Sequence, residues 1–141
     1  MIRKYNESDT ELVLKIWLSA SIRAHNFVKP EFWESQVENM RSIYIPASET
    51  YVYEKNSKVV GFYSLYENNL AAIFVVPEMQ GQGIGKQLLA HAKSQRSSLT
   101  LSVYQENEAS YQFYLSQGFK VVSEQIDEHT GYPEYTMSTA T

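Results

Sequence analysis

The stretch FVVPEMQGQGIGKQLL, Phe74–Leu89, places three alternating glycines between an apolar segment and a helical pattern. Each glycine loses more conformational freedom on folding than any other residue, so Gly81, Gly83 and Gly85 need a reason for standing so close together. A bound anion provides one, because glycine has no Cβ to keep a ligand away from the backbone N–H groups. The following helix would add a partial positive charge at its N-terminus. The stretch therefore predicts a phosphate-binding turn.

The spacing of the glycines excludes two common nucleotide motifs. A Walker A loop requires glycine where Gln80 stands and serine or threonine where Gln87 stands. A dinucleotide fingerprint requires a third glycine where Lys86 or Leu88 stands, and it follows a strand of a parallel unit. The strands expected before this turn look antiparallel, so neither motif fits.

The rest of the chain predicts an α/β domain with the order β-α-α-β-β-β-α-β-α-β-β. The first helix is expected to begin at a capping box formed by Ser8 and Glu11. The second runs from Pro30 and stops before Pro46. Three β-rich runs in residues 50–77 predict an antiparallel meander. Later elements are a helix after the glycine turn, a strand at 98–105, a helix at 107–118 and strands at 119–126 and 133–139. No linker or repeat divides the chain, so one domain covering residues 1–141 is expected.

Composition excludes several classes of function. The chain has 12 Lys+Arg against 16 Asp+Glu, a net charge of −4 that disfavours nucleic-acid binding. It has no cysteine, so thiolate metal sites and cysteine nucleophiles are excluded. The histidines, His25, His91 and His129, lack the spacing of metal ligands, so no metal is expected. No apolar run approaches the roughly 20 residues needed to span a bilayer, and the N-terminus lacks a signal-peptide pattern. We expect a cytoplasmic protein with no membrane partner.

A third glycine motif does fit. Gln80, Gly83 and Gly85 match the pattern Q/R-x-x-G-x-G/A, between a strand that ends in VVP and a helix that opens with IGKQLL. This resembles the coenzyme A pyrophosphate loop of the GNAT superfamily of N-acetyltransferases. The segment NEASYQFYLSQGF, residues 107–119, is similar to the family's N-x-x-A-x-x-F-Y-x-x-x-G-F segment. With the order of elements, the resemblance covers nearly the whole chain.

The resemblance implies the α/β (α+β) GNAT acyl-CoA N-acyltransferase fold, a mixed and mostly antiparallel sheet with a splay between strands 4 and 5. It implies an acyltransferase that moves an acetyl group from acetyl-CoA to a primary amine without a metal. Direct attack in a ternary complex is expected, because no cysteine exists to carry an acyl intermediate. The expected partners are coenzyme A and a small-molecule or peptide amine, and either a monomer or a homodimer is compatible.

By resemblance, the pantetheine arm lies along the backbone of the fourth strand and the pyrophosphate lies in the glycine turn. Val75 is expected to help polarise the thioester carbonyl. For Lys86 a solvated helix lysine is an alternative, and for Asn107 a plain helix N-cap is one. The expected cofactor-binding residues are Phe74, Val75, Val76, Gln80, Gly81, Gln82, Gly83, Ile84, Gly85, Lys86, Asn107 and Tyr114.

Tyr114 occupies the motif tyrosine, and the resemblance gives it the role of general acid toward the departing thiolate. The alternative is an ordinary aromatic packed beside Phe113. Tyr104 and Tyr111 are the fallback proton donors.

The general base is open at the level of sequence. Many relatives carry a glutamate six positions before the residue that matches Val75, but here Asn69 stands there and an amide cannot accept the proton. Glu67 is close in sequence, and His25 has a suitable ordinary pKa. A water chain to solvent is a third option.

The acceptor is expected near residues 24–33, which join the two helices that form the acceptor wall in the family. His25, Phe27 and Trp33 are the candidate acceptor-binding residues, with ordinary core packing as their alternative. A non-catalytic acyl-CoA-binding module is the competing function, supported by Asn69, and an interaction domain is another. The sequence leaves the identity of the amine open.

Overall fold

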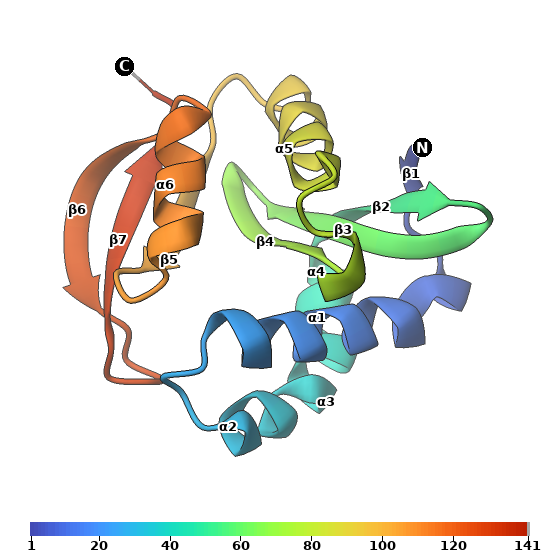
Figure 1. The fold of residues 1–141 in the computed structure, drawn as a ribbon, viewed down its shortest axis with the longest axis horizontal. Coiled ribbons are helices and arrows are strands. Elements are labelled where there is room, and N and C mark those ends of the chain that lie inside the picture. Colours follow the sequence, from blue (N-terminus) through green and yellow to red (C-terminus); the bar gives the residue numbers. More distant parts are fainter. Residues whose placement is uncertain (141) are drawn as a thin grey trace.

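The computed structural model describes residues 1–140, which form a seven-stranded sheet with the order β1-β2-β3-β4-β5-β7-β6 (Figure 1). Within it β4 and β5 are parallel neighbours, and the other neighbours are antiparallel. The strands are β1 (Ile2–Lys4), β2 (Glu49–Lys55), β3 (Lys58–Tyr66), β4 (Asn69–Val75), β5 (Thr100–Tyr104), β6 (Lys120–Ile126) and β7 (Pro133–Ser138). This topology confirms the mixed, mostly antiparallel sheet expected from the sequence.

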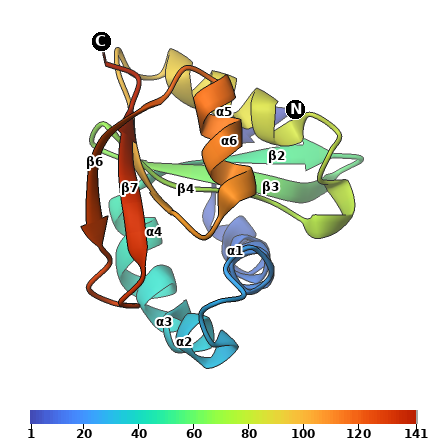
Figure 2. The same ribbon diagram turned by 60° about the vertical axis from the view of Figure 1, so that its left-hand side comes forward.

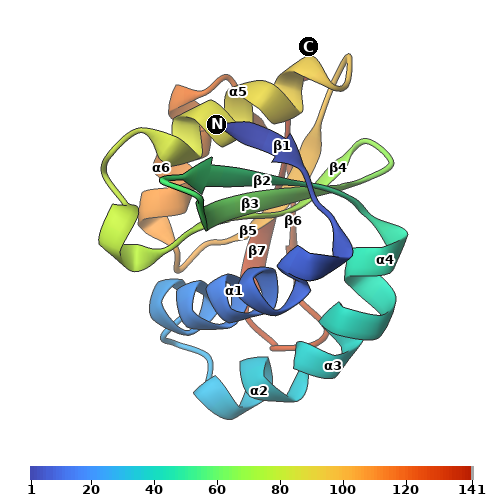
Figure 3. The same ribbon diagram turned by 90° about the vertical axis from the view of Figure 1, so that its right-hand side faces the viewer.

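Helices cover both faces of the sheet (Figures 2 and 3). Helices α5 (Ile84–Ser94) and α6 (Glu108–Ser116) lie over one face, and α1 (Thr10–Ala24) with the short helices that follow it lies over the other. The short helical elements are η1 (Glu7–Asp9), α2 (Pro30–Ser35), α3 (Val37–Asn39), η2 (Met40–Tyr44), α4 (Ile45–Ala47) and η3 (Pro77–Met79).

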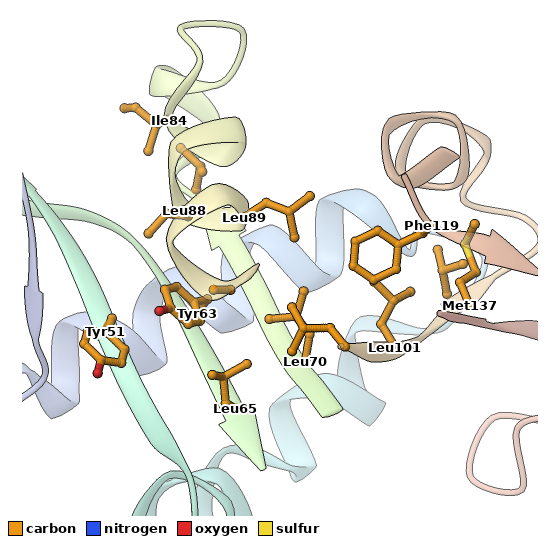
Figure 4. Close-up of a cluster of buried hydrophobic side chains, with 14 of the residues drawn as sticks. Tyr51, Tyr63, Leu65, Leu70, Ile84, Leu88, Leu89, Leu101, Phe119 and Met137 are labelled. Atoms are coloured by element: carbon orange, nitrogen blue, oxygen red, sulfur yellow. The ribbon is translucent and has the colours of Figure 1, made fainter. Parts of the chain in front are cut away.

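Each face has its own hydrophobic core. The core under α5 and α6 joins Leu88 and Leu89 to Tyr63, Leu101 and Phe119, all at most 2% exposed (Figure 4). The apolar residues of α5 recur at helical spacing, and it is this stripe that packs here. The second core packs α1 and α2 against the opposite face of β2, β3 and β4. Two filled faces hold the central strands rigid and so position the edge of β4 that faces β5.

The first helix does not begin at the expected capping box. The capping box belongs instead to the short turn η1 just before it: the side chain of Asn6 accepts from Ser8 N–H, while Asp9 accepts from Asn6 N–H. Asp9 also receives two hydrogen bonds from Arg3, at 2.9 and 3.0 Å. The pairing of Ser8 with Glu11 was wrong, because the arginine of β1 supplies Asp9 with a partner that local spacing could not reveal.

The second predicted helix is interrupted. It divides into α2, α3, the π-helical turn η2 and α4, and Pro46 lies inside α4 rather than beyond its end. Proline has no N–H for the carbonyl one turn earlier, so a regular α-helix cannot pass through it. Just before Pro46 the helical hydrogen bond spans five residues instead of four, since Ile45 N–H donates to Met40 O. Such π turns are frequent at functional sites.

No helix within residues 1–140 combines the length and the apolar character needed to cross a membrane.

Candidate active site

Strands β4 and β5 separate almost at once, and the opening between them is the centre of the candidate site. Their register contains one residue pair, Asn69 with Thr100. Beyond it β4 is paired, among the described residues, on one edge only, with β3. In an antiparallel pair successive residues direct their backbone groups to alternate edges, and Val76 N–H donates toward β3 at 2.9 Å. The backbone groups of Ile73 and Val75 therefore face the opening.

The opening forms a cleft of about 910 Å³. It is bounded by the end of α1, the open edge of β4, the glycine turn, β5 and the start of α6. The structure gathers here most of the site residues expected from the sequence. Those that line the cleft are His25, Trp33, Phe74, Val75, Gln80, Gly81, Gly83, Gly85, Lys86, Asn107 and Tyr114.

Five expected residues lie outside the lining of this cleft. Ile84 is buried in the core under α5, and Gln82 accepts a hydrogen bond from Lys55 Nζ at 3.2 Å. Val76 turns its N–H away, toward β3. Phe27 packs against Tyr104 and Tyr132, and Glu67 is exposed in the turn between β3 and β4. Glu67 is therefore poorly placed to serve as the base.

The glycine turn leaves a row of free backbone donors. Gly81 and Gly83 have φ values of +83° and +82°, in the left-handed region that favours glycine, and a Cβ on either would meet no atom within 4 Å. Gly83 is also the N-cap of α5. Among the described residues, no hydrogen bond uses the N–H groups of residues 81–86. Free donors at a helix N-terminus, open to a cleft, suit a pyrophosphate.

Gln80 fixes this turn to the strand before it. Its Nε2 donates to the carbonyl of Val75 at 3.2 Å, on the edge of β4 that faces the opening. Gln80 thus ties the glycine turn to the end of β4.

Tyr114 projects from α6 into the cleft. Its ring packs against Phe113 and Phe119, with centroids 5.6 and 5.7 Å away. Burial raises the pKa of its phenol well above the ordinary value, so the hydroxyl keeps its proton at neutral pH. No hydrogen bond within residues 1–140 engages that hydroxyl. It is therefore free to donate to a group bound in the cleft.

The position of Asn107 is compatible with both roles considered from the sequence, helix N-cap and cofactor binding. Its Oδ1 accepts from Ser110 N–H at 3.3 Å, as an N-cap does. Its Nδ2 lies 3.4 Å from Nε2 of His25, and both side chains line the cleft. The residue thus ties the start of α6 to the end of α1.

His25 lies in an aromatic cage. Its ring centroid is 5.2 Å from that of Trp33 and 5.1 Å from that of Tyr104. Burial lowers the pKa of His25 to about 4, so it is neutral at physiological pH and a weak base. Its Nδ1 is buried without a hydrogen-bond partner among the described residues. The geometry suits packing and positioning better than proton removal.

A second cavity of about 730 Å³ adjoins the first on the side of α2, η2 and the β6–β7 connection. The two share the lining residues Trp17, Trp33, Ala71, Ala72 and Tyr104. Met40, Ile43 and Tyr44 of the π-helical turn line its outer part. The splay of β4 and β5 therefore has a hollow on each side.

Two carboxylates near the boundary between the two cavities were not predicted from the sequence. Glu134 of β7 is the one acidic side chain that lines the first cavity within the described residues, and Asp127 lines the second. Strand pairing places Glu134 opposite Tyr104. No local pattern marks Glu134, because its pairing with Tyr104 joins segments about thirty residues apart in the sequence. Glu134 could have been found from the sequence by predicting that β7 is the strand that pairs with β5.

Charge is divided between the two sides. Arg23 of α1 and Lys86 of α5 line the first cavity, while Glu134 and Asp127 lie toward the β6–β7 end. The arrangement provides for an anion at the glycine turn and for a cation near β7. Within residues 1–140 no cluster of three or more His, Asp or Glu side chains could hold a metal ion.

Comparisons with known proteins agree with this geometry. The family described as Acetyltransferase (GNAT) domain matches residues 11–140. The chain is 34% identical to peptidyl-lysine N-acetyltransferase YiaC of Escherichia coli (strain K12) over 139 residues, which cover 98% of this chain and 95% of that protein.

Solved structures show the same likeness. The solution structure of apo-form YjaB from Escherichia coli superposes with a TM-score of 0.87 at 28% identity, covering 99% of this chain and 97% of that one. The PaiA N-acetyltransferase of Thermoplasma acidophilum, solved in complex with coenzyme A, shares the fold with a TM-score of 0.83 at 21% identity, covering 100% of this chain and 98% of that one.

Proposed function

The chain belongs to the GNAT family of acetyltransferases, which move an acetyl group from acetyl-CoA to an amine, and on this premise we propose that its acceptor is a lysine side chain in a peptide or protein. The names of two relatives support this acceptor, since YiaC and YjaB are both peptidyl-lysine N-acetyltransferases. The observation that carries the proposal is the pair of adjoining cavities, one with free backbone donors and one with an acidic, apolar wall.

The first cavity suits the donor. The free N–H groups of residues 81–86 and the side chain of Lys86 would hold the pyrophosphate. The open edge of β4 would pair with the amide groups of the pantetheine arm, in the manner of an added strand. That pairing would leave the thioester between Val75 and Tyr114.

The second cavity suits a peptide better than a small polar amine. Ile43, Tyr44 and Tyr66 are 54%, 49% and 51% exposed at its rim. Large apolar side chains so exposed around one cavity offer a surface for a partner to cover. Asp127 and Glu134 would attract the cationic end of the lysine toward the splay.

Chemistry then rests on positioning and proton transfer. Once the ammonium has lost one proton, the lysine nitrogen attacks the thioester carbonyl, whose developing negative charge the N–H of Val75 stabilises. The nitrogen loses its second proton to solvent as the amide forms. The carbon–sulfur bond breaks as the protonated phenol of Tyr114 gives its proton to the sulfur. Solvent then returns a proton to Tyr114. Tyr114 is thus the proposed general acid.

A panel of acceptors tests the proposal. Purified enzyme should be incubated with acetyl-CoA and either Nα-acetylated lysine peptides, matched peptides with arginine in place of lysine, spermidine, or an aminoglycoside. Thiol release, corrected for hydrolysis, gives the rate, and mass spectrometry locates the acetyl group. We expect acetyl-lysine in the lysine peptides and no product with the arginine peptides. A higher kcat/KM for spermidine or the aminoglycoside than for every peptide would overturn the lysine assignment.

A further inference from the structure

An alkyl ammonium must lose a proton before it can attack. With a pKa near 10.4, roughly one lysine amine in 2,500 is neutral at pH 7. The side chains considered from the sequence are poorly suited to take that proton. Asn69 is an amide that accepts from Thr100 Oγ1 at 3.3 Å, Glu67 lies outside the cleft, and burial holds the pKa of His25 near 4.

Glu134 of β7 lies at the boundary between the two cavities. It lines the first cavity and is the direct cross-strand partner of Tyr104, whose side chain lines both cavities. Directly opposed residues of antiparallel strands point to the same face of the sheet. The ring of Tyr104 in turn packs against His25 and Phe27. The carboxylate therefore lies on the acceptor face of the sheet, beside the wall that the two cavities share.

The carboxylate is also free to accept a proton. One oxygen, Oε1, accepts from Gln125 Nε2 at 3.3 Å, and no other hydrogen bond within residues 1–140 reaches the group. Asp127 differs, because its oxygens accept from Tyr104 Oη, from Thr130 Oγ1 at 3.3 Å and from His129 N–H at 2.9 Å. Asp127 holds the loop and Tyr104 in place, whereas Glu134 keeps an oxygen available.

We propose that Glu134 is the general base, whose carboxylate takes the proton that the acceptor ammonium loses. The ammonium and the carboxylate become a neutral amine and a carboxylic acid. The amine nitrogen then forms its bond to the acetyl carbon, the carbon–sulfur bond breaks and the sulfur takes its proton from Tyr114. The amide nitrogen releases its second proton to solvent, and Glu134 and Tyr114 return to their starting states by exchange with solvent. No further reactant is needed.

The surroundings of Glu134 favour this role. Burial and then the nearby charge of Asp127 raise its pKa, while the hydrogen bond from Gln125 and the charge of His129 act in the opposite direction. The net shift is upward, which makes the carboxylate a stronger base than an exposed glutamate. Tyr104, the cross-strand partner of Glu134, and His25, which packs against Tyr104, are uncharged at neutral pH, since burial raises the pKa of the first and lowers that of the second.

The test compares wild type with Glu134→Gln, which keeps the shape and can still accept from Gln125. Glu124→Gln, which removes an exposed carboxylate on the neighbouring strand β6, is the matched control. Two acceptors are used for each protein: a lysine peptide, and trifluoroethylamine, which is already neutral at pH 7. Melting temperature and acetyl-CoA affinity confirm that each variant is folded and binds its donor.

We expect E134Q to lower kcat/KM for the lysine peptide by about 10²- to 10⁴-fold, the range of general base catalysis, and to leave that for trifluoroethylamine unchanged. Its rate with the peptide should also rise about tenfold per pH unit, following the neutral fraction of the amine, where the wild-type rate is nearly flat. Glu134→Asp should recover part of the activity. Equal losses for both amines, or an unchanged pH profile, would overturn the proposal.

The inference rests on the proposed function only in requiring an alkyl amine as acceptor. If wild type ignores lysine peptides and acetylates a polyamine, the lysine assignment fails. The same pair of measurements with the polyamine and trifluoroethylamine would still decide the role of Glu134.

Discussion

Replacing Gly83 by alanine separates the strain of the glycine turn from its role in binding. Gly83 has φ +82°, and a Cβ there would meet no atom within 4 Å. The substitution therefore creates no clash, and its cost is the left-handed conformation itself, about 1–2 kcal/mol for an L-residue. Unfolding entropy near 2.1 cal/mol/K per residue gives about 0.3 kcal/mol/K for this chain, so Tm should fall by about 3–7 °C.

Gly131 provides the matched control. It also has a positive φ, +76°, and a Cβ there would likewise meet no atom within 4 Å, but it lies in the β6–β7 connection and not in the lining of the cleft. Gly131→Ala should lose a similar amount of stability for the same reason. Any difference between the two variants in binding coenzyme A then reports on the turn and not on backbone strain.

The expected difference is large. A methyl group on Gly83 would occupy the open space before α5 and keep an anion from the free N–H groups. Losing one charge-assisted hydrogen bond costs about 1.5–3 kcal/mol, which raises the Kd of coenzyme A about 10- to 150-fold. Isothermal titration of both variants measures this directly. If Gly83→Ala bound coenzyme A as tightly as Gly131→Ala, the pyrophosphate would not lie at this turn.

Other substitutions test the proposed general acid Tyr114, the partly buried ion pair of Arg3 with Asp9, and the partly buried side chain of His25. Tyr114→Phe should lower kcat about ten- to a thousandfold and leave acetyl-CoA affinity nearly intact, and an unchanged kcat would remove Tyr114 as proton donor. Asp9→Ala should lower the free energy of unfolding by about 2 kcal/mol in denaturant titrations, because Asn6 and Arg3 lose a shared partner. Hydrogen bonds from Arg3 lower the pKa of Asp9 in the folded protein. In wild type, the stability that Asp9 contributes should therefore be complete at pH values above its pKa in the unfolded chain, near 4, and should be lost as the pH falls through its lower pKa in the folded protein. The pKa of His25, about 4 in the folded protein, implies that stability falls by up to about 1.4 kcal/mol per unit as pH drops from 6.5 toward 4, a slope that His25→Leu should remove.

The sequence predicted those parts of the site that depend on the backbone. Three glycines after an apolar strand indicated the turn, because glycine spacing is a local pattern, and the resemblance to the GNAT family implied the splay. Gln80, Gly83 and Tyr114 accordingly line one cleft.

The parts that escaped prediction depend on contacts between distant segments. Asp9 rather than Glu11 completes the cap because Arg3 reaches it from β1. The π-helical turn arises because Pro46 removes a donor from a pattern that otherwise reads as continuous helix. Glu134 reaches the site only because β7 inserts between β5 and β6, and spacing along the chain cannot indicate that neighbour.

The single pair of residues that joins β4 to β5 gives the sheet a mechanical property. Among the described residues, strands β1 to β4 and strands β5 to β7 are joined in register at one pair, Asn69 with Thr100, so a rotation between the two groups of strands would hinge at that pair. From that hinge to Val75 is six residues, about 20 Å at 3.3 Å per residue. A rotation of about 5° at the hinge would therefore widen the far end by about 1.7 Å, close to the length of one carbon–carbon bond. A small change of backbone angle near Asn69 would therefore change the width of the opening beside Val75.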